Sequence, residues 1–235
     1  MSTNILWQPN EILLKESALA KFIISLGFNV HNYEEFHNWS IHNKADFWRA
    51  VWNFTGVIGE IGKIIYKPNT FAKMTGAQFF PEARLNLAEN LLKGEDKFLA
   101  VIEVDESGNR TEFTMGKIRE KVGKVAEGLL EKGVKPGDRV AAILPNRIEA
   151  LITLLASASV GAIWTSCSPD FGTKGIIDRI GQTTPKVLFT TSTYIYNSKE
   201  HDFSSRISEV VSCLKNLDSI VIVDDININK FEIGY

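Results

Sequence analysis

Cysteine is scarce in this chain of 235 residues, which contains only Cys167 and Cys213 and no Cys-x-x-Cys pair. Two isolated cysteines cannot form the disulfide framework of a small secreted domain, and they fit a reducing compartment. The four histidines lack the spacing of a His-x-x-x-His or His-Glu-x-x-His motif. We therefore expect no metal site among them.

Long hydrophobic runs and a strong charge of one sign are also missing. Met1–Pro9 has neither a basic region nor an apolar stretch of signal-peptide length, and the most apolar run, Ala150–Trp164, is short and broken by hydroxyl residues. The net charge of −2 argues against a nucleic-acid-binding surface. We expect a cytoplasmic protein that binds neither membrane nor nucleic acid.

What the chain does have is enough apolar residues for a packed core, 44% of the total against 23% charged. The sequence pattern changes near residue 95. Residues 1–94 are predicted to be a helical, aromatic-rich cap region. Residues 95–235 are predicted to be a first α/β subdomain.

The cap region carries two amphipathic patterns, which predict helices over Glu11–Leu26 and Lys44–Phe54. Gly59–Ala88 is rich in Gly, Pro and Asn and is predicted to be an irregular connector, followed by a short helix over Asn86–Leu92. Five aromatic residues could line a ligand site, but ordinary packing is favoured, because aromatic rings dominate packing energy. They are Trp39, Phe47, Trp48, Trp52 and Phe54.

The second region alternates strand and helix patterns. Strands are predicted over residues 98–104, 111–113, 139–144, 162–166, 186–191 and 219–223. Helices are predicted over residues 147–160, 174–181 and 203–214, and another begins at the N-cap Thr114. Asn146 and Glu149 resemble a capping box for the 147–160 helix. This alternation indicates parallel βαβ units.

Gly181–Lys186 (GQTTPK) superficially resembles a phosphate-binding loop. It follows a helix and precedes a strand, so it lies at the wrong edge of a parallel sheet, because ligands bind beyond the carboxyl ends of the strands. We interpret it as a helix stop and turn.

The loop Ser166–Gly172 follows a strand and precedes a helix, so it lies on the ligand-binding edge. A ligand contact and a helix N-cap at Ser168 or Asp170 are both compatible with this pattern. Cys167 is interpreted as a small buried thiol rather than a nucleophile, because no His lies near it in sequence to activate it. The charged Lys199–Asp202 stretch is interpreted as a solvated loop.

Three stretches have a family counterpart. They are LWQP at residues 6–9, GAQFFPEARLNLAENLL at residues 76–92 and WTSCSPDFG at residues 164–172. With the more widely shared PGDRV at residues 136–140, they resemble the acetoacetate–CoA ligases (acetoacetyl-CoA synthetases), a branch of the adenylate-forming superfamily. The match runs from about residue 5 to residue 220.

The resemblance implies the N-terminal part of an adenylate-forming ligase large domain, with an incomplete sheet. It also implies a two-step reaction, in which acetoacetate and ATP give an acyl-adenylate and pyrophosphate, and CoA then gives acetoacetyl-CoA and AMP. The complete enzyme would use ATP, CoA and Mg. The family's phosphate loop, nucleotide-binding residues and adenylation lysine have no counterpart in these 235 residues, so the resemblance implies no catalytic residue and no metal ligand here.

What the resemblance carries over is part of a CoA-binding surface, at Ser168, Pro169, Asp170 and Lys199. The chain lacks an arginine expected near Tyr196. We therefore expect a truncated ligase that is inactive alone, whose partners are the substrates acetoacetate, ATP and CoA and a missing C-terminal half.

A non-catalytic CoA- or partner-binding module, and one half of a split ligase, stay open as alternatives. The incomplete sheet also predicts self-association, because an unpaired edge exposes backbone N–H and C=O groups.

Overall fold

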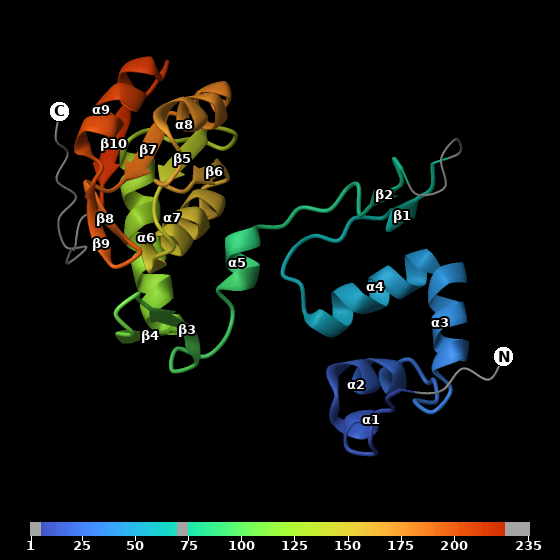
Figure 1. The fold of residues 1–235 in the computed structure, drawn as a ribbon. Coiled ribbons are helices and arrows are strands. Elements are labelled where there is room, and N and C mark those ends of the chain that lie inside the picture. The colour runs from blue at the N-terminus through green and yellow to red at the C-terminus, as the bar shows by residue number, and fades with distance from the viewer. Residues whose placement is uncertain (1–5, 70–74, 224–235) are drawn as a thin grey trace. The chain divides into compact units, whose positions relative to one another are not determined.

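The computed structural model describes residues 6–69 and 75–223 (Figure 1). The chain forms two compact units, Met1–Leu85 and Asn86–Tyr235, and each is described by itself. The assignment of residues 1–94 to a cap region and of residues 95–235 to a subdomain stays a prediction. Among the described residues, no helix is long and apolar enough to cross a membrane.

The first unit is helical. Its elements are α1 (Leu13–Glu16), α2 (Ala18–Ser25), α3 (Tyr33–His42), α4 (Lys44–Thr55), β1 (Tyr66–Lys67) and β2 (Gln78–Phe79). The single helix expected over residues 11–26 is wrong. Ser17 is extended, with ψ of 151°, and its hydroxyl accepts the Ala20 N–H at 3.1 Å. The hydroxyl therefore starts a second helix, since a capping serine satisfies an N–H that has no partner within the helix.

Aromatic rings form the core of this unit. The ring of Phe22 is buried, and its centroid lies 6.0 Å from that of Phe36, 6.1 Å from that of Phe47 and 5.0 Å from that of Phe54. Trp39 and Phe47 pack against the same cluster. These contacts agree with the packing interpretation of the aromatic residues.

The second unit is α/β. It begins with α5 (Leu87–Leu91), a hairpin of β3 (Leu99–Val104) and β4 (Arg110–Thr114), and α6 (Met115–Glu131). It continues with β5 (Arg139–Ile143), α7 (Ile148–Ser159), β6 (Ile163–Cys167), α8 (Thr173–Ile180) and β7 (Val187–Thr190). A second hairpin, β8 (Thr193–Tyr196) and β9 (Lys199–Asp202), precedes α9 (Ser204–Cys213) and β10 (Ser219–Ile222).

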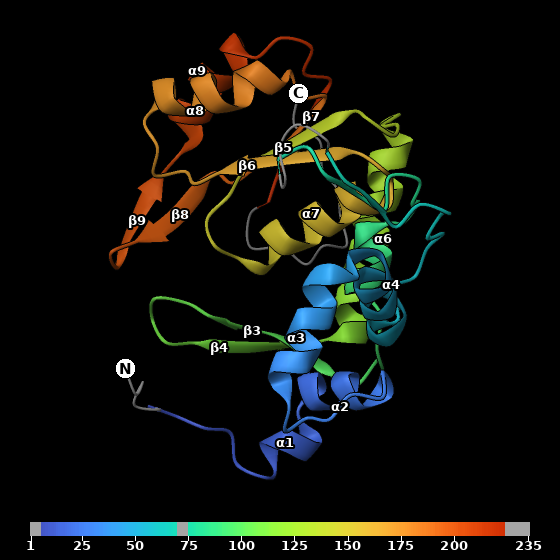
Figure 2. The same ribbon diagram turned by 90° about the vertical axis from the view of Figure 1, so that its right-hand side faces the viewer.

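Four of these strands form a parallel sheet in the order β10-β7-β5-β6. The side chains of alternate residues of β5 pack into two hydrophobic cores. Val140 and Ala142 face a cluster that includes α6 and α7, and Ala141 and Ile143 face one that includes α8 and α9. Figure 2 shows the two helix pairs on opposite faces of the sheet. The predicted parallel βαβ arrangement is confirmed.

Two local predictions fail. Lys199–Asp202 is not a loop but strand β9, paired antiparallel with β8 around a turn at Asn197 and Ser198. The capping box at Asn146 is also absent, because Arg147 occupies the N-cap position without a side-chain cap bond. Glu103, on β3, accepts the Ile148 N–H at 2.8 Å instead.

Candidate functional site

The carboxyl ends of β5, β6 and β7 meet at one edge of the sheet, because all three strands are parallel. Open α/β sheets bind ligands beyond this edge. The segment after β6 contains Ser168–Asp170, and the segment after β7 leads directly into the β8–β9 hairpin with Lys199. This edge is therefore the candidate site.

Ser168 and Asp170 lie together at this edge and bond to each other. The Ser168 hydroxyl donates to Asp170 Oδ2 at 2.7 Å, and the Asp170 N–H donates to Ser168 Oγ at 3.2 Å. Neither caps α8, whose N-cap is Gly172 and has no side-chain cap bond. The N-cap interpretation of this loop is wrong, and within residues 6–69 and 75–223 no side chain caps the first turn of α8.

Arginines from two helices hold this loop. Arg206, in the first turn of α9, donates from Nη1 to the Pro169 carbonyl at 2.9 Å. The guanidinium of Arg179, on α8, lies 4.2 Å from the centroid of the Phe171 ring, within range of a cation–π contact. Sequence reasoning missed both arginines, since their partners are distant in sequence or are revealed only by the side-chain geometry.

Lys199 is exposed and begins β9, where it pairs with Tyr196. It lies on a separate element from Ser168–Asp170, and among the described residues it makes no hydrogen bond to them. The preceding turn is fixed from elsewhere, because Glu106 accepts the Asn197 N–H at 3.1 Å and the Ser198 N–H at 2.7 Å. The structure thus gathers three of the four predicted site residues and places the fourth on the neighbouring hairpin.

Cys167 ends β6, beneath this loop. Burial raises the pKa of its thiol to about 11, and the nearby Arg179 only partly opposes that shift. A thiol with this pKa is neutral at physiological pH, and the thiolate is the nucleophilic form. The interpretation of Cys167 as a packing residue is therefore supported.

The last paired residues of β5, β6 and β7 at this edge include a buried hydroxyl without a hydrogen-bond partner among the described residues. Thr190, at the end of β7, is fully buried, and its Oγ1 has no hydrogen-bond partner among the described residues. Its register partner is Ile143, which in turn pairs with Cys167. The three paired residues beneath the candidate site are thus Ile143, the neutral thiol of Cys167 and Thr190, whose hydroxyl has no partner among the described residues.

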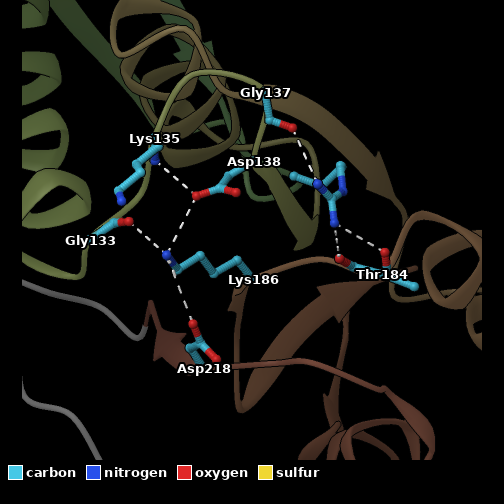
Figure 3. A network of polar contacts seen from close by, with 8 residues as sticks. Gly133, Lys135, Gly137, Asp138, Thr184, Lys186 and Asp218 are labelled. Atoms are coloured by element: carbon cyan, nitrogen blue, oxygen red, sulfur yellow. Dashed lines mark hydrogen bonds and ion pairs between the residues drawn. The ribbon is translucent and has the colours of Figure 1, made fainter.

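Gly181–Lys186 serves a structural role at the opposite edge (Figure 3). Arg139 donates to the carbonyls of Thr183 and Thr184 at 2.9 and 3.0 Å. Lys186 donates to the Gly133 carbonyl at 2.6 Å and lies 3.4 Å from the Asp138 carboxylate. These contacts close the amino edge of the sheet, in agreement with the helix-stop interpretation.

The Asp138 carboxylate completes this network. It accepts the Lys135 N–H at 2.9 Å. That bond, with the charges of Lys186 and Arg139, holds the pKa of Asp138 below its usual value despite an opposing effect of burial. The contacts of Lys135 and Lys186 with Asp138 are therefore made to an ionised carboxylate at neutral pH.

The helical unit has a cleft of its own, with a volume of about 490 Å³. Its walls are mostly apolar, and its charged groups are one carboxylate and one guanidinium. It is lined by Ser25, Leu26, Trp39, Asp46, Arg49, Ala50, Asn53 and Phe54. No nucleophile–base pair lies in this lining, so we do not assign the cleft a reaction.

A metal site is missing from the part of the chain that the structure describes. Within residues 6–69 and 75–223, no three His, Cys, Asp or Glu side chains are grouped so that they could hold a metal ion. The magnesium that the family resemblance implies is therefore not assigned to residues of these ranges.

Comparison with known proteins identifies the family. The family model of AMP-binding enzymes matches residues 92–233. The acetoacetyl-coenzyme A synthetase of Rhizobium meliloti is 40% identical over 89% of this chain and 32% of its own length. A malonamoyl-CoA synthetase of Penicillium aethiopicum is 35% identical over 91% of this chain and 32% of its own length.

A solved structure gives the same result. The acetoacetyl-CoA synthetase from Streptomyces lividans superposes with a TM-score of 0.84 at 34% identity, covering 94% of this chain and 35% of that one. The fold is therefore that of an adenylate-forming ligase, and the chain spans about a third of the length of the relatives it matches. This chain belongs to the family of AMP-binding enzymes.

Proposed function

We propose that this chain is the N-terminal portion of an ATP-dependent acid–CoA ligase that makes acetoacetyl-CoA, AMP and pyrophosphate from acetoacetate, ATP and CoA through an acyl-adenylate. The observation that carries the proposal is the likeness to the Streptomyces lividans synthetase, with a TM-score of 0.84 over 94% of the chain. The acetoacetyl-coenzyme A synthetase of Rhizobium meliloti, at 40% identity, supports acetoacetate as the acyl group.

Within that enzyme, these residues would form part of the CoA surface. Ser168, Pro169 and Asp170 form an ordered loop at the carboxyl edge of the sheet, and Arg206 holds the loop backbone. The adjacent first turn of α8 has no side-chain cap. Free N–H groups and the helix dipole favour an anion there, so a phosphate of CoA is a suitable ligand. Lys199 would add a cation from the neighbouring hairpin.

Catalysis needs groups positioned around the reacting phosphate and carbonyl. The described residues offer no such set, and they hold no metal site through which a magnesium-dependent step could be derived. We therefore expect the isolated 235-residue polypeptide to bind CoA without forming a thioester. The cytoplasmic location expected from the sequence likewise stays a prediction.

Calorimetry with CoA and with pantetheine, which lacks the phosphates, tests the proposed surface. Lys199→Ala is expected to weaken CoA binding up to about fivefold, because an exposed ion pair with a phosphate is lost, and to leave pantetheine binding unchanged. Lys215→Ala, an exposed lysine on the loop leading into β10 at the other edge, is the matched control. Equal effects of the two variants, or no heat with CoA, would contradict the assignment.

A further inference from the structure

The tips of the two hairpins of the α/β unit meet, although they lie 91 and 92 residues apart in sequence. Glu106, in the β3–β4 turn, accepts two consecutive backbone N–H groups from the β8–β9 turn, with one carboxylate oxygen for each. The distances are 3.1 Å to the Asn197 N and 2.7 Å to the Ser198 N. Figure 2 shows the two hairpins reaching toward each other.

The β8–β9 turn is shaped to donate to such an acceptor. Asn197 and Ser198 both have left-handed backbones, with φ of 52° and 57°. This is the pattern of a two-residue type I′ turn, which leaves these N–H groups at the tip. Among the described residues, no other side chain accepts from either of them. Bonds from N–H groups to a carboxylate are charge-assisted and stronger than neutral ones.

The β3–β4 turn, which carries the acceptor Glu106, is stiff. Asp105 Oδ1 accepts the Ser107 and Asn109 N–H groups, both at 2.9 Å, and Asp105 Oδ2 accepts the Asn109 side-chain amide at 2.8 Å. The Asp105 carboxylate thus bonds only within its own turn among the described residues. This leaves the neighbouring carboxylate, on Glu106, to reach across to the other hairpin.

The other end of the β8–β9 hairpin is fixed independently. Tyr194 is buried, and its ring centroid lies 5.1 Å from that of His201 and 5.9 Å from that of Phe203. The Phe203 N–H also donates to the Ser192 carbonyl at 2.7 Å. Loss of the Glu106 contact would therefore free the tip while the base stays packed in the core.

We propose that Glu106 is a positioning residue that holds the tip of the β8–β9 hairpin and thereby fixes the position of Lys199. Lys199 is the residue directly after the turn that Glu106 binds. The consequence for a CoA-type ligand rests on the proposed function, but the contact between the hairpins does not.

Amide hydrogen exchange of the 235-residue chain tests this proposal by comparing Glu106→Ala and Glu106→Gln with the unaltered chain. Glu106→Ala is expected to speed exchange at Asn197 and Ser198 about tenfold, because both lose a charge-assisted bond. The Tyr194 amide and the melting temperature should stay unchanged. Glu106→Gln, which keeps one acceptor oxygen, should give a smaller increase.

The matched control is Glu112→Ala. It removes the same charge from the same hairpin, but Glu112 pairs with Arg110, and no contact between Glu112 and β8–β9 is found among the described residues. Unchanged exchange at Asn197 and Ser198 in Glu106→Ala, or an equal increase in Glu112→Ala, would overturn the proposal. If exchange rises as expected but calorimetric affinity for CoA is unaltered, the positioning of the hairpin stands and the role assigned to Lys199 fails.

Discussion

At the residue scale, Thr190 is a buried hydroxyl without a partner among the described residues. An unsatisfied buried hydroxyl costs about 1–3 kcal/mol, and removing it while keeping the side-chain shape recovers part of that cost. We predict that Thr190→Val raises the free energy of unfolding by about 1 kcal/mol, measured by urea denaturation.

The adjacent threonine provides the control. Thr191 is equally buried, but its hydroxyl donates to the Thr193 carbonyl at 2.6 Å. Thr191→Val is therefore expected to lower the free energy of unfolding by about 1 kcal/mol. Equal destabilisation by both variants would show that the Thr190 hydroxyl has a partner.

The lowered pKa of Asp138 predicts that the stability of the fold depends on pH. Its pKa is lowered, first by the Lys135 N–H and then by the charges of Lys186 and Arg139. A carboxyl whose pKa is lowered on folding stabilises the protein above its unfolded value, 3.8, and loses that contribution as the pH falls through the folded value. Asp138→Asn should thus be less stable than the unaltered chain at pH 7, with a gap that narrows below about pH 3.8.

Denaturant unfolding of both proteins between pH 7 and pH 2 measures this gap. The same measurement on Asp105→Asn provides a comparison with Asp138→Asn. The pKa of Asp105 is also lowered, but by hydrogen bonds within its own turn. A gap between Asp138→Asn and the unaltered chain that stays constant down to pH 2 would show that the Asp138 charge contributes nothing.

At the scale of elements, Asn86 joins two helices. Its Oδ1 caps α5 by accepting the Ala88 N–H at 2.9 Å, and its Nδ2 donates to the carbonyls of Ala158 and Ser159, at 3.0 and 3.1 Å. Asn86→Asp keeps the cap but loses the donors and places a negative charge at the carboxyl end of α7. We predict a loss of about 1–3 kcal/mol in the free energy of unfolding.

Asn86→Ser separates the two roles. Serine is also a good N-cap, but it lacks both the charge and the reach to α7. It should cost less than Asn86→Asp in the same urea titration. If aspartate is tolerated as well as serine, the contact between Asn86 and α7 is not important for stability.

The elements also show what the sequence could predict. The order of β5, α7, β6, α8, β7, α9 and β10 follows from periodic apolar segments separated by turn residues, and the structure confirms each of them. The sequence does not predict strand β9 of the β8–β9 hairpin, because Lys199–Asp202 is polar and little buried. Helix α3 was missed because Phe36 is its only buried residue.

Long-range bonds limited the prediction of the site. The loop Ser168–Asp170 could be placed because it follows a strand, which is a local signal. Its anchor, Arg206, lies 37 residues from Pro169, and the Glu103 that caps α7 lies 45 residues from Ile148. Local patterns carry no information about such partners, so only the folded structure reveals them.

At the scale of the whole molecule, β6 has β5 as its only strand neighbour among the described residues. Ile163 on this strand is 54% exposed. An open edge that carries an apolar side chain pairs readily with another copy. We predict that the 235-residue chain self-associates as its concentration rises, measured by sedimentation velocity, and that Ile163→Lys reduces this.

The helix residue Ile24 is 53% exposed and provides a matched control. Ile24→Lys adds the same charge at similar exposure, but on helix α2 rather than on a strand, so it should leave the association unchanged. A monodisperse monomer over the whole concentration range would contradict the prediction.

We propose that these residues belong to an acetoacetate-activating ligase. The most direct test is to capture the native protein from source cells with an antibody against residues 1–90 and to assay carboxylate-dependent ATP–pyrophosphate exchange. We expect exchange with acetoacetate that clearly exceeds exchange with acetate or propionate. Absence of exchange with every carboxylate, from protein that still binds CoA, would contradict it.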